Sequence, residues 1–257
     1  MDFSLSHKLN RVAQGAARII LDAKRNMAVD QKAGHGNFVT EYDVKVQKYI
    51  KSHLLEIMPD AKFIGEEDIE QSELPMGYCF IVDPIDGTCN FMYDYKCSAI
   101  SIALLYDKQV VAGVICNPYT NEYFSAELGK GAKLNGSLIK ASSRNFEDAL
   151  VLFGTSPYYP ELADKTMAIA TDCLKSCKDL RRSGSAATDL AWIASGRADL
   201  FFELTLSPWD FAAGSLICQE AGAKIVQPDG SPLDFGKQCG VVAGSPKAVD
   251  QFISRNQ

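Results

Sequence analysis

Apolar residues near the start of the chain recur every three or four positions, with basic side chains between them. This spacing puts an apolar stripe along one face of a helix, which we expect over residues 3–28. A second stripe of the same period predicts a helix over residues 43–58. Apolar runs bounded by turn residues predict strands at 61–65, 78–83, 98–106, 109–116, 122–127, 138–141 and 149–154.

Helical and strand patterns alternate after the turn at Ser156-Pro157. We expect helices at 160–177, from Thr188 to about 196, at 210–221 and from 246, with strands at 198–203, 223–227 and 239–243. The chain is therefore predicted to have an N-terminal α+β half, residues 1–155, and a C-terminal α/β half, residues 156–257. We expect the two halves to pack in layers as one unit.

Composition narrows the function classes. The chain has 257 residues and a net charge of −6, and no basic tract stands out, which argues against a nucleic-acid partner. No apolar run approaches the roughly 20 residues of a membrane span, and the first residues do not resemble a signal peptide. Eight cysteines show no C-x-x-C spacing, which favours reduced, buried thiols. We therefore expect a cytoplasmic protein without a membrane partner.

The most informative stretch is Asp83-Pro84-Ile85-Asp86-Gly87-Thr88, at the end of a predicted strand. Proline biases Asp83 toward an extended backbone, and Gly87 permits a close approach of a ligand. Two carboxylates held on such a turn supply the hard oxygen ligands that Mg²⁺ prefers. A lone D-x-x-D is more often an ordinary turn, so the neighbouring acids decide the interpretation.

Three further acids lie at the ends of predicted elements. Glu66 follows a short strand, whereas Asp43 and Asp210 begin helices. Each helix acid taken alone is better explained by N-capping. If Glu66, Asp83, Asp86 and Asp210 converge, two charges about 4 Å apart repel by roughly 4 kcal/mol, and divalent cations would remove that repulsion. The three histidines are scattered, which disfavours zinc and favours magnesium.

A run of small residues, Gly184 to Ala187, precedes the helix that continues to about 196. Free N–H groups at such a helix start bind anions, although small residues there are also ordinary packing. Arg181 and Arg182 could attract phosphate, or at least one of them could be solvated surface.

With these motifs in order, the chain closely resembles the inositol monophosphatase family of magnesium-dependent, lithium-sensitive phosphatases. Asp83 to Phe91 matches the first family signature, and Trp209 to Gly214 matches the second. The supporting motifs, in family order, are Asn37 to Asp43, Gly65 to Glu67, Gly131 to Gly136 and Gly184 to Ala187. The resemblance covers essentially the whole chain and implies a layered αβαβα sandwich and a homodimer.

By resemblance, the metal ligands are Glu66, Asp83, the Ile85 carbonyl, Asp86 and Asp210. Asp83 would bridge two Mg²⁺ ions, and a third, weaker ion would depend on Glu66 through water. The family pattern also implies three catalytic residues. Thr88 would orient the attacking water, Asp43 would direct the Thr88 hydroxyl, and Glu66 would support that water.

The resemblance also implies a substrate site, formed by Ile85, Asp86, Gly87, Thr88, Gly184, Ser185, Ala186, Glu203 and Asp210. Phosphate would lie against Gly87, Thr88 and the helix start, while Glu203 would bind hydroxyls of the alcohol part. Lys32 would lie on a mobile loop that borders the third ion.

One departure from the family pattern bears on the substrate. The family often carries a histidine and then a proline after the position of Phe91, where this chain has Met92 to Lys96. We expect a phosphomonoesterase acting on a small polyol phosphate, with myo-inositol monophosphate first. The alternatives are fructose 1,6-bisphosphate, histidinol phosphate or a nucleotide 3′-phosphate as substrate, or a catalytically silent binding protein on the same scaffold.

Overall fold

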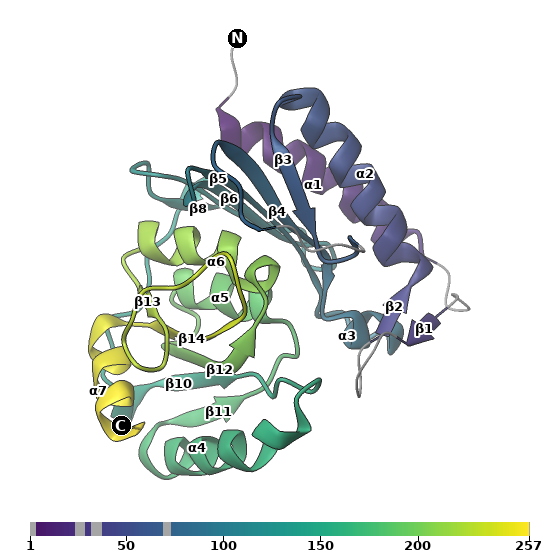
Figure 1. The fold of residues 1–257 in the computed structure, drawn as a ribbon. Coiled ribbons are helices and arrows are strands. Elements are labelled where there is room, and N and C mark those ends of the chain that lie inside the picture. The colour runs from purple at the N-terminus through teal and green to yellow at the C-terminus, as the bar shows by residue number, and fades with distance from the viewer. Residues whose placement is uncertain (1–3, 24–28, 32–37, 69–72, 257) are drawn as a thin grey trace.

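The computed structural model describes residues 4–23, 29–31, 38–68 and 73–256. Two large sheets and three helix layers lie one behind another, and β1 (Val29–Gln31) and β2 (Phe38–Thr40) form a separate two-stranded sheet (Figure 1). In order, the layers are α1 (Leu5–Leu21) with α2 (Glu41–Ile57), a seven-stranded sheet, α5 (Ala186–Ala194) with α6 (Pro208–Glu220), a five-stranded sheet, and α4 (Ala163–Ser176) with α7 (Pro246–Asn256). The predicted layered α/β fold is confirmed.

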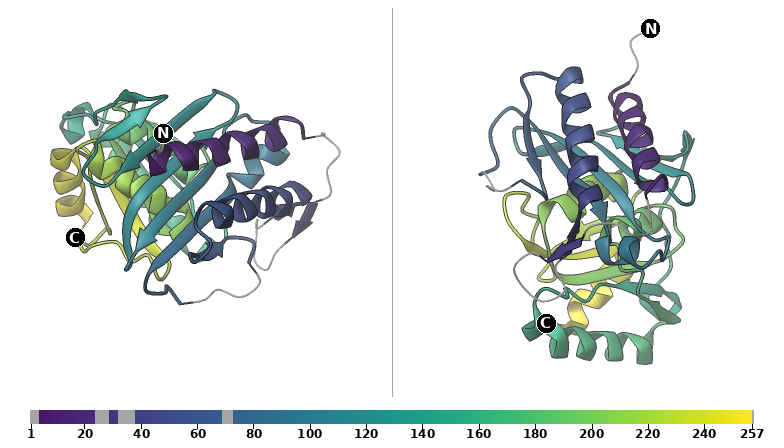
Figure 2. Two further views of the ribbon diagram at one scale, coloured as in Figure 1. Left: turned by 90° about the horizontal axis from the view of Figure 1, so that it is seen from above. Right: turned by 90° about the vertical axis from the view of Figure 1, so that its right-hand side faces the viewer.

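The seven-stranded sheet has the order β3-β4-β5-β6-β7-β8-β9. Its strands are β3 (Lys62–Gly65), β4 (Tyr78–Asp86), β5 (Ala99–Tyr106), β6 (Gln109–Asn117), β7 (Glu122–Glu127), β8 (Ala132–Leu134) and β9 (Ser137–Leu138). Only the β3–β4 pair is parallel. Successive side chains of β4 point to opposite faces, so Phe80 packs under α1 and α2 while Ile81 packs against the middle helices. Figure 2 shows α1 and α2 side by side on the outer face of this sheet.

The five-stranded sheet has the order β11-β10-β12-β14-β13. Its strands are β10 (Leu150–Phe153), β11 (Asp179–Arg181), β12 (Leu200–Leu206), β13 (Lys224–Val226) and β14 (Cys239–Gly244). Alternating β12 residues again face two layers, with Phe201 toward α5 and α6 and Phe202 toward α4 and α7. The chain passes from one sheet to the other before β10, slightly ahead of the expected boundary at residues 155 and 156.

Helix α6 joins the two sheets. It is buried along nearly its whole length and contacts strands of both sheets. Its backbone comes so near β6 that a Cβ on Gly113 would lie 2.9 Å from the Ala213 carbonyl oxygen. This close contact fixes the start of α6, and with it Asp210, relative to the large sheet.

The structure differs from the expectations mainly in short elements. Helix α1 ends at Leu21, where the apolar stripe stops, and the part of the expected helix over 24–28 lies outside the described residues. The expected strand 138–141 reduces to the end of β9. The unexpected elements are β1, β2, α3 (Thr88–Met92), β8, β11 and two 3-10 turns at Phe146–Asp148 and Pro160–Leu162. Elements this short contain too few residues to show a helical or strand period in the sequence. Among the described helices, none is long and apolar enough to cross a membrane.

Candidate active site

The turn after β4 presents two acids to one side. Against β5, Asp83 pairs with Ser101 and Asp86 with Ala99, so β4 carries one extra residue. Such a bulge breaks the strict alternation of a strand, and residues three apart can then point the same way. The Asp83 carboxylate also accepts the Ile85 N–H at 2.9 Å, which holds the turn in place.

Gly87 ends this turn with φ 87°, a conformation that favours glycine, and caps α3. A Cβ there would lie 3.0 Å from the Gly184 carbonyl oxygen, so the glycine also lets the turn approach the loop before α5.

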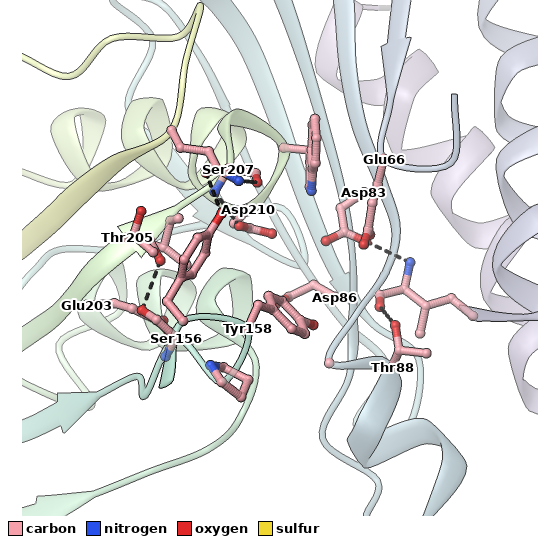
Figure 3. Close-up of a pocket in the computed structure, with 17 residues that line it drawn as sticks. Glu66, Asp83, Asp86, Thr88, Ser156, Tyr158, Glu203, Thr205, Ser207 and Asp210 are labelled. Atoms are coloured by element: carbon pink, nitrogen blue, oxygen red, sulfur yellow. Dashed lines mark hydrogen bonds between the residues drawn. The ribbon is translucent and has the colours of Figure 1, made fainter. Parts of the chain in front are cut away.

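Three carboxylates converge at the start of α6. Ligand atoms of Asp83, Asp86 and Asp210 all lie within 4.8 Å of one another. Asp210 is placed by the capping box of α6, in which its carboxylate accepts the Ser207 N–H at 2.7 Å. Glu66, directly after β3, lines the same cavity of about 360 Å³, as does Ile85 (Figure 3).

Burial and mutual repulsion shape the protonation of these acids. Burial, followed by the charges of Glu66, Asp86 and Asp210, raises the pKa of Asp83 well above its usual range. Burial raises the pKa of Asp86 to about 6 even though Ser185 and backbone N–H groups donate to it. Burial and the neighbouring acids also raise the pKa of Asp210.

The raised pKa values of these acids indicate that too little positive charge surrounds them to offset burial and mutual repulsion. The cluster offers only carboxylate and carbonyl oxygens, the donor set that suits Mg²⁺ and not zinc. The residues present therefore fit a magnesium site.

Thr88 and Asp43 meet although they come from different helices. The Thr88 hydroxyl lies 3.2 Å from one Asp43 carboxylate oxygen and 3.1 Å from the Ile85 carbonyl oxygen. The other oxygen of Asp43 accepts the N–H and hydroxyl of Thr40, at 2.7 and 2.5 Å, in the capping box of α2. Asp43 is fully buried, and this burial raises its pKa to about 6.

The start of α5 is already engaged by an acid. One oxygen of Asp86 accepts the Ser185 hydroxyl at 2.5 Å and the Ala187 N–H at 2.8 Å. Gly184, with φ 86°, turns the chain into this helix, and both Gly184 and Ala186 line a second pocket, which shares Asp86 and Thr88 with the cavity. The predicted phosphate cradle is therefore next to the carboxylate cluster and shares donors with it.

Glu203 lies on β12 at the opposite wall and is 7% exposed. One of its oxygens accepts the Ser156 N–H at 2.8 Å and the Ser156 hydroxyl at 3.3 Å. A Cβ on Gly154 would lie 1.8 Å from the other oxygen, so the glycine makes room for this carboxylate. Burial raises the pKa of Glu203 to about 7. No ion pair joins Glu203 to a cation of the described residues.

Several lining residues were not foreseen from the sequence. Tyr158 stands between the acids of the large sheet and Glu203 (Figure 3). A chain of hydrogen bonds runs from the Tyr159 hydroxyl to Gln238 at 2.6 Å, and from Gln238 to the Ser207 hydroxyl at 3.0 Å. Tyr158 and Tyr159 follow the predicted turn at Pro157, and Gln238 lies in the loop before β14. No periodic pattern in the sequence marks any of the three as a lining residue.

Two predictions about cations have different outcomes. Lys32 lies outside the described residues, as do Gly34, His35 and Gly36. Arg181 is exposed and pairs with Asp179 at 2.5 Å, which leaves Arg182 as the arginine that borders the second pocket.

Fold and site together define a class: layered α/β proteins with a buried carboxylate cluster beside a helix start. The sequence model of the inositol monophosphatase family matches residues 5–257. The chain belongs to this family, so the resemblance seen in its motifs is confirmed.

Relatives with known names agree with this assignment. The chain is 38% identical to Inositol monophosphatase 2 of Solanum lycopersicum over 228 residues, which cover 85% of this chain and 84% of that protein. It is 35% identical to Nus factor SuhB of Escherichia coli K12, over 86% and 83% of the two chains. The structure of the suhB protein of Bartonella henselae superposes with a TM-score of 0.90 at 33% identity, covering 98% of this chain and 97% of that one. The family supports a phosphatase, and the names leave its substrate open.

Proposed function

We propose that this chain is a Mg²⁺-dependent phosphomonoesterase that hydrolyses the phosphate ester of a small polyol, with myo-inositol monophosphate as the first candidate. The observation that carries the proposal is the convergence of Asp83, Asp86 and Asp210 within 4.8 Å, in a cavity that also contains Thr88 and Glu203. The proposed metal ligands are Glu66, Asp83, the Ile85 carbonyl, Asp86 and Asp210, holding two or three ions. Bound Mg²⁺ would polarise the phosphoryl group and lower the pKa of the attacking water.

The protein groups divide the remaining work. The Thr88 hydroxyl donates to Asp43 at 3.2 Å, so its oxygen is left to accept a hydrogen bond from the water that would lie in the cavity. Gly87 has no side chain to exclude the phosphate, which would lie near the start of α5 and share donors there with Asp86, the acceptor of the Ala187 N–H. Glu66 borders the same space and is the third proposed catalytic residue.

The alcohol part would lie toward Glu203, across the cavity from the turn after β4. A buried carboxyl group binds hydroxyl donors well, and a charge-assisted hydrogen bond contributes about 1.5–3 kcal/mol. This arrangement favours a polyol over an alcohol without further hydroxyls. We also propose that the protein works as a homodimer in the cytoplasm, in keeping with its family and its eight free thiols.

A nucleotide phosphate is the second candidate substrate. A Staphylococcus aureus relative, SaIMPase-II, has been solved with bound 2′-AMP and superposes on this chain with a TM-score of 0.81 at 25% identity. Tyr158, Tyr159 and Trp209 line the cavity here and offer aromatic faces to a base. Fructose 1,6-bisphosphate and histidinol phosphate are weaker alternatives. The proposed metal site would serve these esters equally well, and no further observation favours them.

The test is phosphate release from myo-inositol 1-phosphate, fructose 1,6-bisphosphate, histidinol phosphate, 2′- and 3′-AMP and 4-nitrophenyl phosphate, with Mg²⁺ or with EDTA. We expect Mg²⁺-dependent release that is fastest for the inositol ester. An Asp210→Asn variant serves as the inactive control, because it keeps the shape of the site and removes one proposed ligand charge. Absence of Mg²⁺-dependent release from every ester would refute the proposal, and preference for an AMP would favour the second candidate.

A further inference from the structure

The cavity continues into a side lobe of about 210 Å³. The side lobe shares Asp86, Thr88 and Glu203 with the main cavity. Its own walls include Gly154, Thr155, Arg182 and Asp189. Because Asp86 and Thr88 belong to both parts, a phosphate beside them can extend its alcohol into either.

Asp189, in the first turn of α5, is one of the residues that line this lobe. Its side chain is 1% exposed, and its Oδ1 atom has no hydrogen-bond partner. A buried polar atom without a partner costs about 1–3 kcal/mol, so such atoms usually have a role or an unseen partner. Burial raises the pKa of Asp189 well above its usual range, and a hydrogen bond with Ser183 offsets only part of this effect.

Glu203 offers a second carboxyl oxygen without a donor in the same lobe. The N–H and hydroxyl of Ser156 donate to Oε1, and no described residue donates to Oε2. The charge of Glu203 raises the pKa of Asp189, which places the two carboxyl groups within electrostatic reach of each other. Asp189 and Glu203 both line this lobe, and a ligand with several hydroxyl donors there would supply the hydrogen bonds that their second oxygens lack.

Arg182 does not neutralise the pair. It is exposed at the rim, donates from Nε to the Thr155 hydroxyl at 3.2 Å, and forms no ion pair with a described residue. Its charge lowers the pKa of both carboxyl groups, but each remains above its usual range.

We propose that Asp189 is a specificity-determining residue: its free Oδ1 forms a hydrogen bond with a hydroxyl of the alcohol that Glu203 also binds. The inference rests on the proposed phosphatase function and adds a second recognition group to it. An alcohol with at least two hydroxyls would bind both carboxyl groups at once. An aryl alcohol without hydroxyls would gain nothing from either.

The competing explanation is that Asp189 only shapes the start of α5 through Ser183. In that case its loss would disturb the phosphate cradle and slow every phosphate ester alike. The two explanations therefore differ in their substrate dependence.

The experiment compares the full-length wild type with Asp189→Ala and Asp189→Asn at saturating Mg²⁺. For myo-inositol 1-phosphate, we expect Asp189→Ala to raise KM about tenfold, the effect of one lost hydrogen bond, with kcat little changed. For 4-nitrophenyl phosphate, neither constant should change more than about twofold. Asp189→Asn keeps an acceptor oxygen and should recover most of the lost affinity.

The matched control is Thr166→Val on α4, which removes another buried polar atom without a partner, outside the cavity. It should leave both substrates unaffected. Equal losses on both esters, or none on either, would overturn the inference and leave the phosphatase proposal intact. Absence of Mg²⁺-dependent hydrolysis in the wild type would instead refute the proposed function. Thermal unfolding of each variant separates these outcomes from misfolding.

Discussion

Asp43→Asn should stabilise the fold at neutral pH and impair hydrolysis. Asp43 is fully buried, and one of its oxygens accepts two hydrogen bonds from Thr40 while the other lies 3.2 Å from the Thr88 hydroxyl. Burial nevertheless raises its pKa from 3.8 to about 6. The folded protein therefore holds the Asp43 proton more tightly than the unfolded chain does.

The sign of the pH dependence follows from this shift. Because the folded-state pKa is the higher one, the contribution of Asp43 to stability is fully present below about pH 4 and is lost as the pH rises through 6. A shift of about two units, at 1.36 kcal/mol per unit, corresponds to about 3 kcal/mol. Asparagine cannot ionise, so the variant should escape this loss.

Urea unfolding in EDTA at pH 4 and pH 8 measures the effect. The difference in unfolding free energy, variant minus wild type, should grow by about 3 kcal/mol between these pH values. At pH 8 with Mg²⁺, turnover should fall about ten- to a hundredfold, since Thr88 loses a charged acceptor. The control Asp60→Asn changes an exposed carboxyl group beyond α2 and should alter neither measurement. A stability difference that does not vary with pH, or turnover equal to that of the wild type, would refute the reasoning.

Three further predictions concern the metal, the alcohol and ion competition. Asp83→Asn should reduce turnover to less than about a tenth, because one charged metal contact contributes several kcal/mol, while thermal unfolding in EDTA stays cooperative; a more active variant would contradict the metal assignment. Glu203→Gln should lower kcat/KM about ten- to a hundredfold for myo-inositol 1-phosphate and far less for 4-nitrophenyl phosphate; equal losses would mean that Glu203 mainly holds Ser156. Millimolar Li⁺ should inhibit phosphate release, as is typical of the family; full activity in tens of millimolar Li⁺ would count against the inositol-phosphate substrate.

The sequence located those acids of the candidate site whose positions depend on local chain chemistry. Asp83 and Asp86 follow a strand, and proline and glycine in the same turn limit how that turn can fold. The bulge that brings both side chains to one face was not predictable, because it depends on pairing with β5.

Long-range packing determined what the sequence could not predict. Asp210 reaches the cluster because α6 fits against Gly113 of β6, a contact between residues 100 positions apart in the chain. Glu203 is held by Ser156 and has room only because Gly154 lacks a side chain. The sequence indicates a turn at Ser156-Pro157 and a strand that ends at Gly154, but neither pattern indicates a contact with Glu203, and Tyr158 lies on the same loop.

The two interpretations of the helix acids turn out not to exclude each other. Asp43 and Asp210 both occupy the third position of a capping box, where an acid accepts the N–H of the cap residue. In each carboxylate this task engages one oxygen, Oδ2. The second oxygen of Asp43 is left for Thr88, and Asp210 still contributes a ligand atom to the cluster. Capping thus fixes the direction of the functional oxygen. An acid that begins a helix is therefore a stronger site candidate when a strand that faces the helix start also ends in acids, as β4 does with Asp83 and Asp86.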